Sequence, residues 1–374
     1  FLMLSTKDPH IILIQIIVLT TMASFFVIIT FGCEITIQFK SNVNFFPSGS
    51  GKMNVMGKVF MDMRHIKVSK VTKIHKSVHY SKYTLPVFIK GKDEAGYLPG
   101  RIKQTPVIIY ELRNTVMTTE TVVVKESGYY LFKVECHPRY WHPFKQNGEI
   151  EVEYDIYESV VCIGHQHSSD WGHWFLEVLP VIILLPEKVL QTSNIAVPRK
   201  RSWVIENLEF FGVSSYQIFD GIERHFYANK IYTAQSKWCG DLNPFVIANF
   251  RKELVARLAL DKAKPTRFVL ANRQANISRH ISNYDELMNR TRSLYPDHPW
   301  EPVTYYYTLA EQGRYFNQVR FLFSVHASLL ANEIFMQPGT VCIELMIENW
   351  LLSFLELGPI TEKIVIVGRD SNIK

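Results

Sequence analysis

The sequence predicts an α/β protein with two doubly wound domains that follow an apolar N-terminal segment. Three observations carry this prediction. The 374 residues exceed one typical domain and fit two of ordinary size once the N-terminal segment is set aside. A content of 47% hydrophobic and 20% charged residues is a globular composition. Strand-like and helix-like patterns alternate from about residue 160 onward, as they do in doubly wound parallel sheets.

The N-terminal segment, residues 11–31, is uncharged and about long enough to cross the ~30 Å hydrocarbon layer as a helix. It lacks small residues before a cleavage point, so we interpret it as a signal anchor. Lys7 precedes it and Glu34 follows it, which favours a cytosolic N-terminus and a lumenal body. We therefore expect residues 1–40 to be the tail and transmembrane helix of a single-pass type II protein of the endoplasmic reticulum or Golgi.

Cysteines and glycosylation sequons bear on the compartment of the body. One of the five cysteines lies at the membrane boundary, and the other four are Cys136, Cys162, Cys239 and Cys342. Their wide separation excludes a CxxC-type zinc site, so disulfides and free buried thiols both stay open. Sequons at Asn276 and Asn289 allow N-glycosylation and agree with a lumenal body.

The formal charge of +6 arises from 41 basic and 35 acidic residues spread along the chain. An excess of this kind suits an anionic small molecule, and no RNA- or DNA-binding signature is present. We expect no nucleic-acid partner.

The body begins with a segment rich in Lys, Ser, His and Gly, residues 41–98, which we interpret as a stem and entry segment. β-branched and aromatic residues then predict strands over 107–110, 121–125, 129–135, 149–157 and 160–164. A polar turn leads to a run of helical length over 171–185, and shorter patterns follow over 203–211, 215–219 and 230–233. We expect residues 99–248 to form the first domain.

The second domain is expected over residues 249–374. Helical patterns cover 250–260 and 328–335, and strand patterns cover 267–271, 320–325 and 340–345. Asn283 with Glu286, and Thr308 with Glu311, are predicted to cap two further helices. Strand, helix and strand in this order predict a compact βαβ unit.

Polar groups follow the expected strand ends of the second domain. Ligands bind beyond the carboxyl ends of parallel strands, where the N–H groups of a helix N-terminus face a phosphate. His326 and the backbone of Ala327, Ser328 and Leu329 come directly after one strand.

Two arginines and a carboxylate complete this expected ligand edge. Arg273 and Arg279 follow a second strand, and their guanidinium groups suit a diphosphate. Glu344 ends a third strand, where a carboxylate can accept ribose hydroxyls.

Five motifs occur in one order from about residue 160 to 344. They are GHWFLEVLP from Gly172 to Pro180, Arg273-x5-Arg279-His-Ile-x-Asn283, Glu311-Gln312, His326 to Phe335, and Pro338 to Glu344. Together they resemble glycosyltransferase family 61. The resemblance implies a GT-B fold of two facing Rossmann-like domains, inversion at the anomeric carbon and no obligatory metal. It also implies a nucleotide-sugar donor, of the UDP-xylose, UDP-GlcNAc or UDP-arabinose type, and a glycan or glycoprotein acceptor.

The chain departs from the family pattern at two places. Ala327, Ser328 and Leu329 stand where the family has a glycine-rich turn, and Glu177 stands where the family commonly has Asp. A nucleotide- or sugar-binding protein that has lost catalysis is therefore an alternative.

The catalytic candidates lie in the first motif. His173 and Glu177 are four residues apart and share one helix face, and we predict that Glu177 takes the proton of the acceptor hydroxyl. Asp170 is a second candidate base or a helix N-cap. Trp171 and Trp174 either stack on a sugar or pack the domain.

A different class of function starts from His165, His167, Asp170 and His173, which form a possible metal cluster of a hydrolase. Their spacing matches no recognised ligand pattern, and the sequence therefore favours the glycosyltransferase without a metal.

Overall fold

The structure is a computed structural model of the 374-residue chain. It describes residues 17–21, 24–28, 45–60, 66–73, 87–88, 107–131, 148–222, 224–235, 242–260, 263–304, 308–346 and 364–369. The chain divides into two units, Phe1–Phe45 and Phe46–Lys374.

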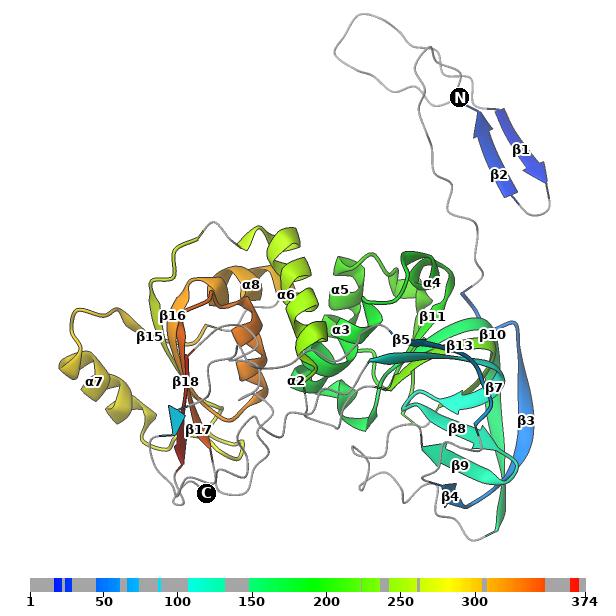
Figure 1. The fold of residues 1–374 in the computed structure, drawn as a ribbon, viewed down its shortest axis with the longest axis horizontal. Helices are drawn as coiled ribbons and strands as arrows, with labels where there is room; N and C mark the ends of the chain where they lie inside the picture. Colours follow the sequence, from blue (N-terminus) through cyan, green and yellow to red (C-terminus); the bar gives the residue numbers. More distant parts are fainter. Residues whose placement is uncertain are drawn as a thin grey trace, which may run out of the picture. The chain divides into compact units, whose positions relative to one another are not determined.

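The described part of the first unit is a pair of antiparallel strands, β1 (Ile17–Thr21) and β2 (Ser24–Ile28) (Figure 1). This differs from the transmembrane helix expected over residues 11–31. Both segments are rich in β-branched and aromatic residues, which fit a strand better than a helix. Among the described residues, no helix is long and apolar enough to cross a membrane. The rest of residues 11–31 lies outside the described residues.

The second unit begins with a mixed sheet of ten described strands. Its strands are β3 (Gly49–Met56), β4 (Val59–Phe60), β5 (Val68–Lys73), β7 (Ile108–Thr118), β8 (Val122–Lys125), β9 (Gly128–Leu131), β10 (Glu149–Cys162), β11 (Asn194–Val197), β12 (Ile218–Asp220) and β13 (His225–Gln235). The order along the sheet is β12-β11-β10-β13-β7-β8-β9-β4, with β3 on β10 and β5 on β7.

The two halves of this sheet differ in direction. β10 pairs in parallel with β11 and β13, and β11 with β12, whereas β7 runs antiparallel to β13 and β8. β10 joins two segments that were predicted as separate strands. Val160, Val161 and Cys162 at its end are fully buried, as expected for a central strand covered on both faces.

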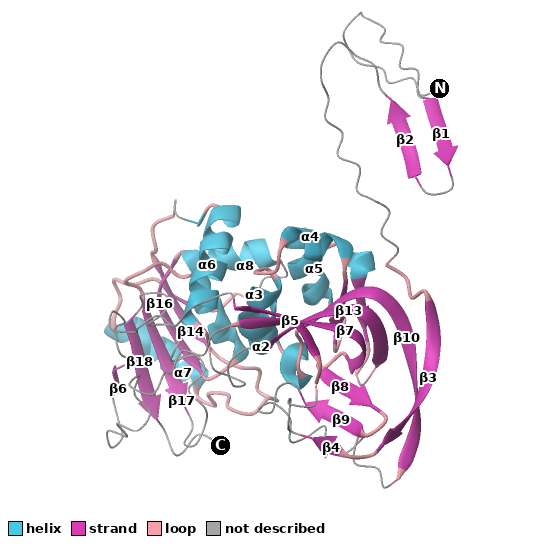
Figure 2. Ribbon diagram, turned by 45° about the vertical axis from the view of Figure 1, so that its right-hand side comes forward, coloured by secondary structure: helices cyan, strands magenta, loops and turns pink. Residues whose placement is uncertain are grey.

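Helical segments follow β10 and β11. They are η3 (Gln166–Ser169), α2 (Trp171–His173), η4 (Trp174–Val178), α3 (Leu179–Ile182), α4 (Glu187–Thr192), α5 (Ser202–Phe210) and η5 (Ser215–Gln217). Figure 2 shows α3, α4 and α5 grouped beside the parallel half of the sheet, away from β8 and β9. The strand, loop and helix order expected from residue 160 onward is present.

The second sheet contains six described strands, all parallel, in the order β15-β14-β16-β17-β18-β6. They are β14 (Arg267–Ala271), β15 (Trp300–Pro302), β16 (Val319–Val325), β17 (Val341–Met346), β18 (Ile364–Arg369) and β6 (Val87–Phe88). β6 comes from the segment expected to be a stem, and it extends the second sheet.

Four helical segments accompany this sheet: α6 (Pro244–Leu258), α7 (Tyr284–Leu294), α8 (Leu309–Asn317) and the 3-10 helix η7 (Ser328–Phe335). In Figure 1, α7 lies on one side of the sheet, and α6 and α8 lie on the other. The chain is therefore an α/β protein with one mixed sheet and one sheet whose described strands are all parallel. The domain boundary expected at residue 249 stays a prediction, and this residue lies within α6.

The two predicted helix caps have different outcomes. Thr308 and Glu311 form the expected capping box at the start of α8. Asn283 makes no side-chain cap on α7, so that prediction was wrong. Its backbone angles, φ −103° and ψ 38°, lie outside the extended region that an N-cap residue adopts, and its amide instead contacts Glu286.

One hydrophobic core connects residues of both sheets. Phe175 is fully buried, and its ring lies 5.1 Å from that of Phe250 and 5.5 Å from that of Phe335. The segment α2 packs directly on η7. The helical segment that follows β10 is thereby packed against the helical segment that follows β16.

Of the cysteines, Cys162 and Cys342 are buried thiols that form no disulfide, and the other three lie outside the described residues. Asn276 and Asn289 are both exposed, as a glycosylated asparagine must be.

Candidate active site

The loop after β10 carries the first group of candidate residues and is fixed at both ends. The Gly164 carbonyl accepts a hydrogen bond of 2.9 Å from the Thr121 hydroxyl. Thr121 has φ +64°, which is unusual for a β-branched residue and indicates backbone strain beside this loop. The His165 N–H donates to the Ser168 hydroxyl at 2.6 Å, which holds the turn η3.

The helix expected over residues 171–185 is interrupted by a π-helical turn, η4, which contains Glu177. The Leu179 N–H donates to the carbonyl of Trp174, five residues earlier. Pro180 has no N–H to continue the α-helical ladder, which explains why the wider turn forms here. Turns of this kind are frequent at functional sites.

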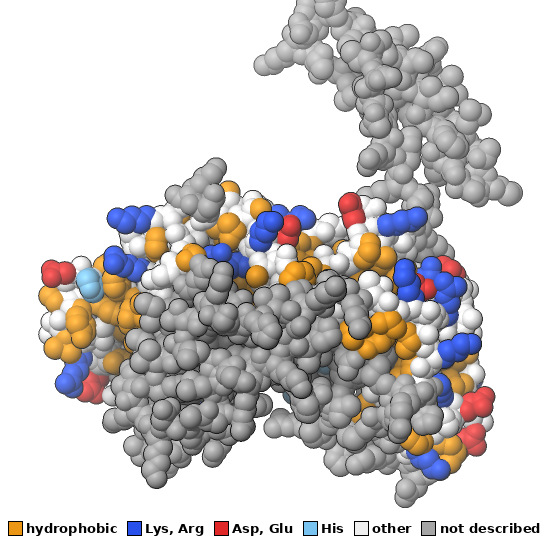
Figure 3. Space-filling model, viewed as in Figure 1, with side chains coloured by type: hydrophobic (Ala, Val, Ile, Leu, Met, Phe, Trp, Pro, Cys, Tyr) orange, Lys and Arg blue, Asp and Glu red, His pale blue; other side chains and the backbone are white. Residues whose placement is uncertain are grey.

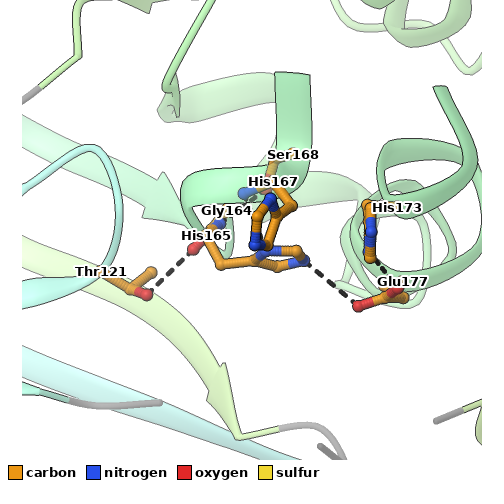
Figure 4. A network of polar contacts seen from close by, with 7 residues as sticks. All are labelled: Thr121, Gly164, His165, His167, Ser168, His173 and Glu177. Atoms are coloured by element: carbon orange, nitrogen blue, oxygen red, sulfur yellow. Dashed lines mark hydrogen bonds and ion pairs between the residues drawn. The ribbon is translucent and has the colours of Figure 1, made fainter. Parts of the chain in front are cut away.

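Glu177 lies between two histidines (Figure 4). Its Oε1 is 2.6 Å from Nδ1 of His173, and its Oε2 is 3.3 Å from Nε2 of His165. Side-chain exposure is 5% for His165, 11% for Glu177 and 31% for His173. Of the three, His173 is therefore the side chain most accessible to a substrate.

The backbone sets the tautomer of His165. The His167 N–H donates to Nδ1 of His165 at 3.3 Å, so Nδ1 has no proton and the neutral ring carries its proton on Nε2. Nε2, which carries this proton, lies 3.3 Å from Oε2 of Glu177, an ion-pair distance. One carboxylate oxygen of Glu177 thus faces a fixed donor, and the other faces His173.

The charge of Glu177 is stabilised in this arrangement. Burial raises its pKa, but the hydrogen bonds and charges of His165 and His173 outweigh burial and hold the pKa well below its usual value. For His173, burial lowers the pKa, but the hydrogen bond to Glu177 and the charges of Glu177 and Asp170 outweigh it and raise the pKa above 6.5. His173 is therefore a stronger base than a free histidine, whereas Glu177 is a weaker base than a free carboxylate.

Asp170 lies at the N-cap position of α2, and its side chain is exposed and makes no capping hydrogen bond. It contributes to the site through its charge on His173. Trp174 is fully buried, and Trp171 stacks on Phe175 at 4.6 Å and lies edge-on to Trp203. Both tryptophans pack the core.

The metal cluster considered from the sequence has a different composition in the structure. Among the described residues, His165, His173 and Glu177 bring one ligand atom each within 4.8 Å of one another. His167 and Asp170 are not part of this group. If a metal bound Nε2 of His165, the proton of the neutral ring would have to be on Nδ1. Nδ1 would then be a donor facing another donor, the His167 N–H. The hydrogen bonding of His165 therefore fits a carboxylate partner better than a metal.

The second group of candidates lies at the carboxyl ends of β14, β16 and β17. Ala271, Ser324 and Glu344 are in register across these strands. Ala327 and Ser328 begin η7 directly afterwards, and Ser328 is exposed.

His326 and Glu344 form a buried pair at this edge. Nδ1 of His326 is 2.5 Å from Oε1 of Glu344, and the two side chains are 10% and 1% exposed. The His326 N–H also donates to the Leu345 carbonyl at 2.9 Å. Burial separates Glu344 from solvent, and its carboxylate supports His326. Its contact with a ribose stays a prediction.

The two arginines lie close enough to interact. Burial lowers the pKa of Arg279, the charge of Arg273 lowers it further, and the charge of Glu344 raises it. Nη1 of Arg273 is buried without a hydrogen-bond partner among the described residues. Two neighbouring guanidinium groups of which one has an unsatisfied donor are well suited to an anion.

Asn272, which sequence reasoning missed, shapes the loop that carries both arginines. Its side-chain oxygen accepts the N–H groups of Arg273 and Ile281, and its amide donates to the Ile281 carbonyl. The loop is thereby closed at its base. Arg279 adopts φ +67° within it. An asparagine directly after a strand is the signal that could have indicated this closure.

Comparison with protein families gives a match for residues 171–343, to the family described as Glycosyltransferase 61. A search of curated proteins finds no match to the chain. The matched segment begins at α2 and ends within β17, so it includes His173, Glu177, both arginines and His326.

Proposed function

We propose that the protein, whose residues 171–343 match the model of glycosyltransferase family 61, moves a sugar from a nucleotide donor to a hydroxyl of a glycan or protein, with inversion. The observation that carries this proposal is the Glu177 carboxylate held between His165 and His173, at 3.3 and 2.6 Å. This is the arrangement of a histidine base oriented by a buried carboxylate.

In the proposed reaction, the acceptor oxygen attacks the anomeric carbon and its proton passes to Nε2 of His173. The bond between that carbon and the donor diphosphate breaks, and its electron pair stays on the diphosphate oxygen. Glu177 holds the ring through Nδ1 and stabilises the imidazolium that forms. Glu177, expected from the sequence to be the base, is here given the orienting role because both its oxygens face histidines. Asp170 adds a favourable charge.

On the donor side we assign the diphosphate to Arg273, Arg279 and the start of η7 at Ala327 and Ser328. The unsatisfied Nη1 of Arg273 and the repulsion between the two arginines support this assignment. His326 borders the same strand ends. UDP-xylose, UDP-GlcNAc and UDP-arabinose are the donor types that the family suggests, with no obligatory metal.

The proposal includes a GT-B arrangement and a lumenal body on a membrane anchor in the Golgi or endoplasmic reticulum. The uncharged length of residues 11–31 and the exposed sequons at Asn276 and Asn289 support the topology. We expect the body to be protected from protease in sealed microsomes. Digestion in intact vesicles, with neither asparagine glycosylated, would contradict it.

The decisive experiment combines binding with turnover. The purified chain is screened against UDP, GDP and UDP-sugars for thermal stabilisation, because a ligand raises apparent stability by mass action. Stabilising UDP-sugars are then tested for transfer to glycan acceptors, with and without EDTA. Stabilisation followed by EDTA-resistant transfer is expected. Binding without turnover would indicate the catalytically inactive alternative, and a chelator-sensitive hydrolysis would indicate the metal-dependent hydrolase.

A further inference from the structure

The run Arg199-Lys200-Arg201 is hereafter called the basic run, and residues 163–170, which connect β10 to α2, are called the catalytic loop. Both lie at the same edge of the sheet. Cys162 of β10 is in register with Ala196 of β11, and both strands run in the same direction. His165 lies three residues after the end of β10, and the basic run begins two residues after β11. Parallel strands that end in register deliver their next residues to one edge.

A direct contact joins the two segments. A β-carbon placed on Gly164 would lie only 3.0 Å from Cδ of Pro198, so the backbone before His165 packs closely on the proline before Arg199. A side chain at residue 164 would require Pro198 to shift by a few tenths of an ångström, so glycine favours this approach. The basic run therefore starts beside the loop that holds His165 against Glu177.

Lys200 fixes the basic run to the neighbouring strand β12. Its N–H donates to the Asp220 carboxylate at 2.9 Å, and its Nζ donates to the carbonyls of Ser215 and Ile218 at 3.2 Å each. Two of the three donors of its ammonium group are used in this anchor, which holds the run in place.

The two arginines of the basic run have a different environment. Arg199 and Arg201 are exposed, and neither guanidinium has an ion pair or hydrogen bond to any residue that the structure describes. Among the described residues, the Asp220 carboxylate contacts the run through the backbone N–H of Lys200. On the face shown in Figure 3, basic side chains occur at separate places among acidic ones. Arg199 and Arg201 therefore differ from the other basic side chains of the surface by their position beside the catalytic loop. They do not form a larger cluster of positive charge.

We propose that Arg199 and Arg201 bind the carboxylate of an acidic glycan acceptor, so that the enzyme prefers acceptors that contain a uronic acid. The inference rests on the proposed function, because it takes His173, in α2 directly after the loop of His165, as the place where the acceptor hydroxyl reacts. Guanidinium groups pair with carboxylates through two parallel hydrogen bonds, which orients the acceptor as well as attracting it. An anionic group held here keeps a neighbouring sugar hydroxyl at the catalytic loop.

The test uses the purified full chain and measures acceptor binding without turnover. Uronic-acid-containing oligosaccharides are compared with the same oligosaccharides after carboxyl reduction, in low and high salt. The double variant Arg199→Gln/Arg201→Gln is compared with a control, Lys188→Gln/Lys252→Gln. Lys188 is exposed on α4, before the amino end of β11, and Lys252 is exposed on α6. Both variants lose two surface charges.

The parent and the control should bind the acidic oligosaccharide more tightly than its reduced form. The arginine variant should lose roughly two- to thirtyfold in affinity for the acidic form only, the range for two exposed charge contacts. Salt should reduce the preference of the parent. Equal binding of both forms by the parent, an unchanged arginine variant, or selective binding of an acidic peptide instead would overturn the inference. Preserved acidic binding without any sugar transfer would count against the proposed function alone.

Discussion

Replacing Glu177 with Gln tests the central assignment because the structure predicts which way the introduced amide must face. His165 donates from Nε2, since its Nδ1 accepts the His167 N–H. The carbonyl oxygen of the introduced amide must therefore face His165. Its NH₂ group must then face Nδ1 of His173, which has to accept and so loses its proton.

The consequence is a change of tautomer in His173. With Nδ1 accepting, the neutral ring carries its proton on Nε2 and cannot take the proton of the acceptor. Loss of general-base catalysis lowers turnover by roughly 10²–10⁴-fold. Loss of the carboxylate that orients a histidine base has an effect of similar size when the histidine then adopts the wrong tautomer. We expect a loss of about this size in kcat, with nucleotide affinity unchanged. The amide is nearly isosteric, so the variant should remain folded.

The assay measures kcat, UDP affinity and melting temperature on Glu177→Gln, with Glu187→Gln as a control. Glu187 is an exposed residue of α4, hydrogen-bonded to Gln191 one turn later. The acidic limb of the pH–rate profile gives a second readout. In the parent it lies above pH 6.5, because the pKa of His173 is raised, and it should move to lower pH when the charge of Glu177 is removed.

Near-parental turnover in a folded Glu177→Gln protein would refute the reasoning. A lower melting temperature together with parental turnover would show that the His173–Glu177 contact only stabilises the fold. If kcat falls but the acidic limb of the pH–rate profile stays at the same pH, another group is the base. Asp170 would then be the first residue to test.

Three further predictions follow from buried contacts. Glu344→Ala should lower the free energy of unfolding by about 3–5 kcal/mol in urea denaturation, because it leaves His326 without its buried partner. Asn272→Ala should weaken UDP binding by about tenfold or more in calorimetry, because the loop of the two arginines loses its closure. The stabilisation from the His173–Glu177 pair should be largest between pH 4.5 and 6.5. The lowered pKa of Glu177 stabilises the fold above pH 4.5 and the raised pKa of His173 stabilises it below pH 6.5, so the difference in melting temperature between the parent and Glu177→Gln should peak there.

Periodicity predicted the elements whose pattern is local. The strand over Arg267–Ala271, the helix starting at Tyr284 and the capping box of Thr308 are as expected. The pairing of strands that are far apart in the chain could not be predicted from the sequence. Residues 87–88 form a short strand against β18, and two separate strand patterns merge into β10, because sheet neighbours decide both outcomes.

The candidate site shows the same division. The spacing of His173 and Glu177 predicted their contact, since residues four apart share a helix face. The role of His165 depends on a backbone N–H that no spacing reveals. The burial of Glu344 and its pairing with His326 follow from the packing around β17. Sequence reasoning located the residues, and their hydrogen-bond partners defined what each can do.

The contact of Phe175 with Phe335 has a consequence for protein engineering. These rings connect the turn that holds Glu177 to the helix that follows His326, so the distance from base to donor site is set by aromatic side-chain volume. Chimeras that exchange only the second half with a relative would place an unmatched residue against Phe175. Such hybrids should bind nucleotide and transfer poorly until the facing position is exchanged as well.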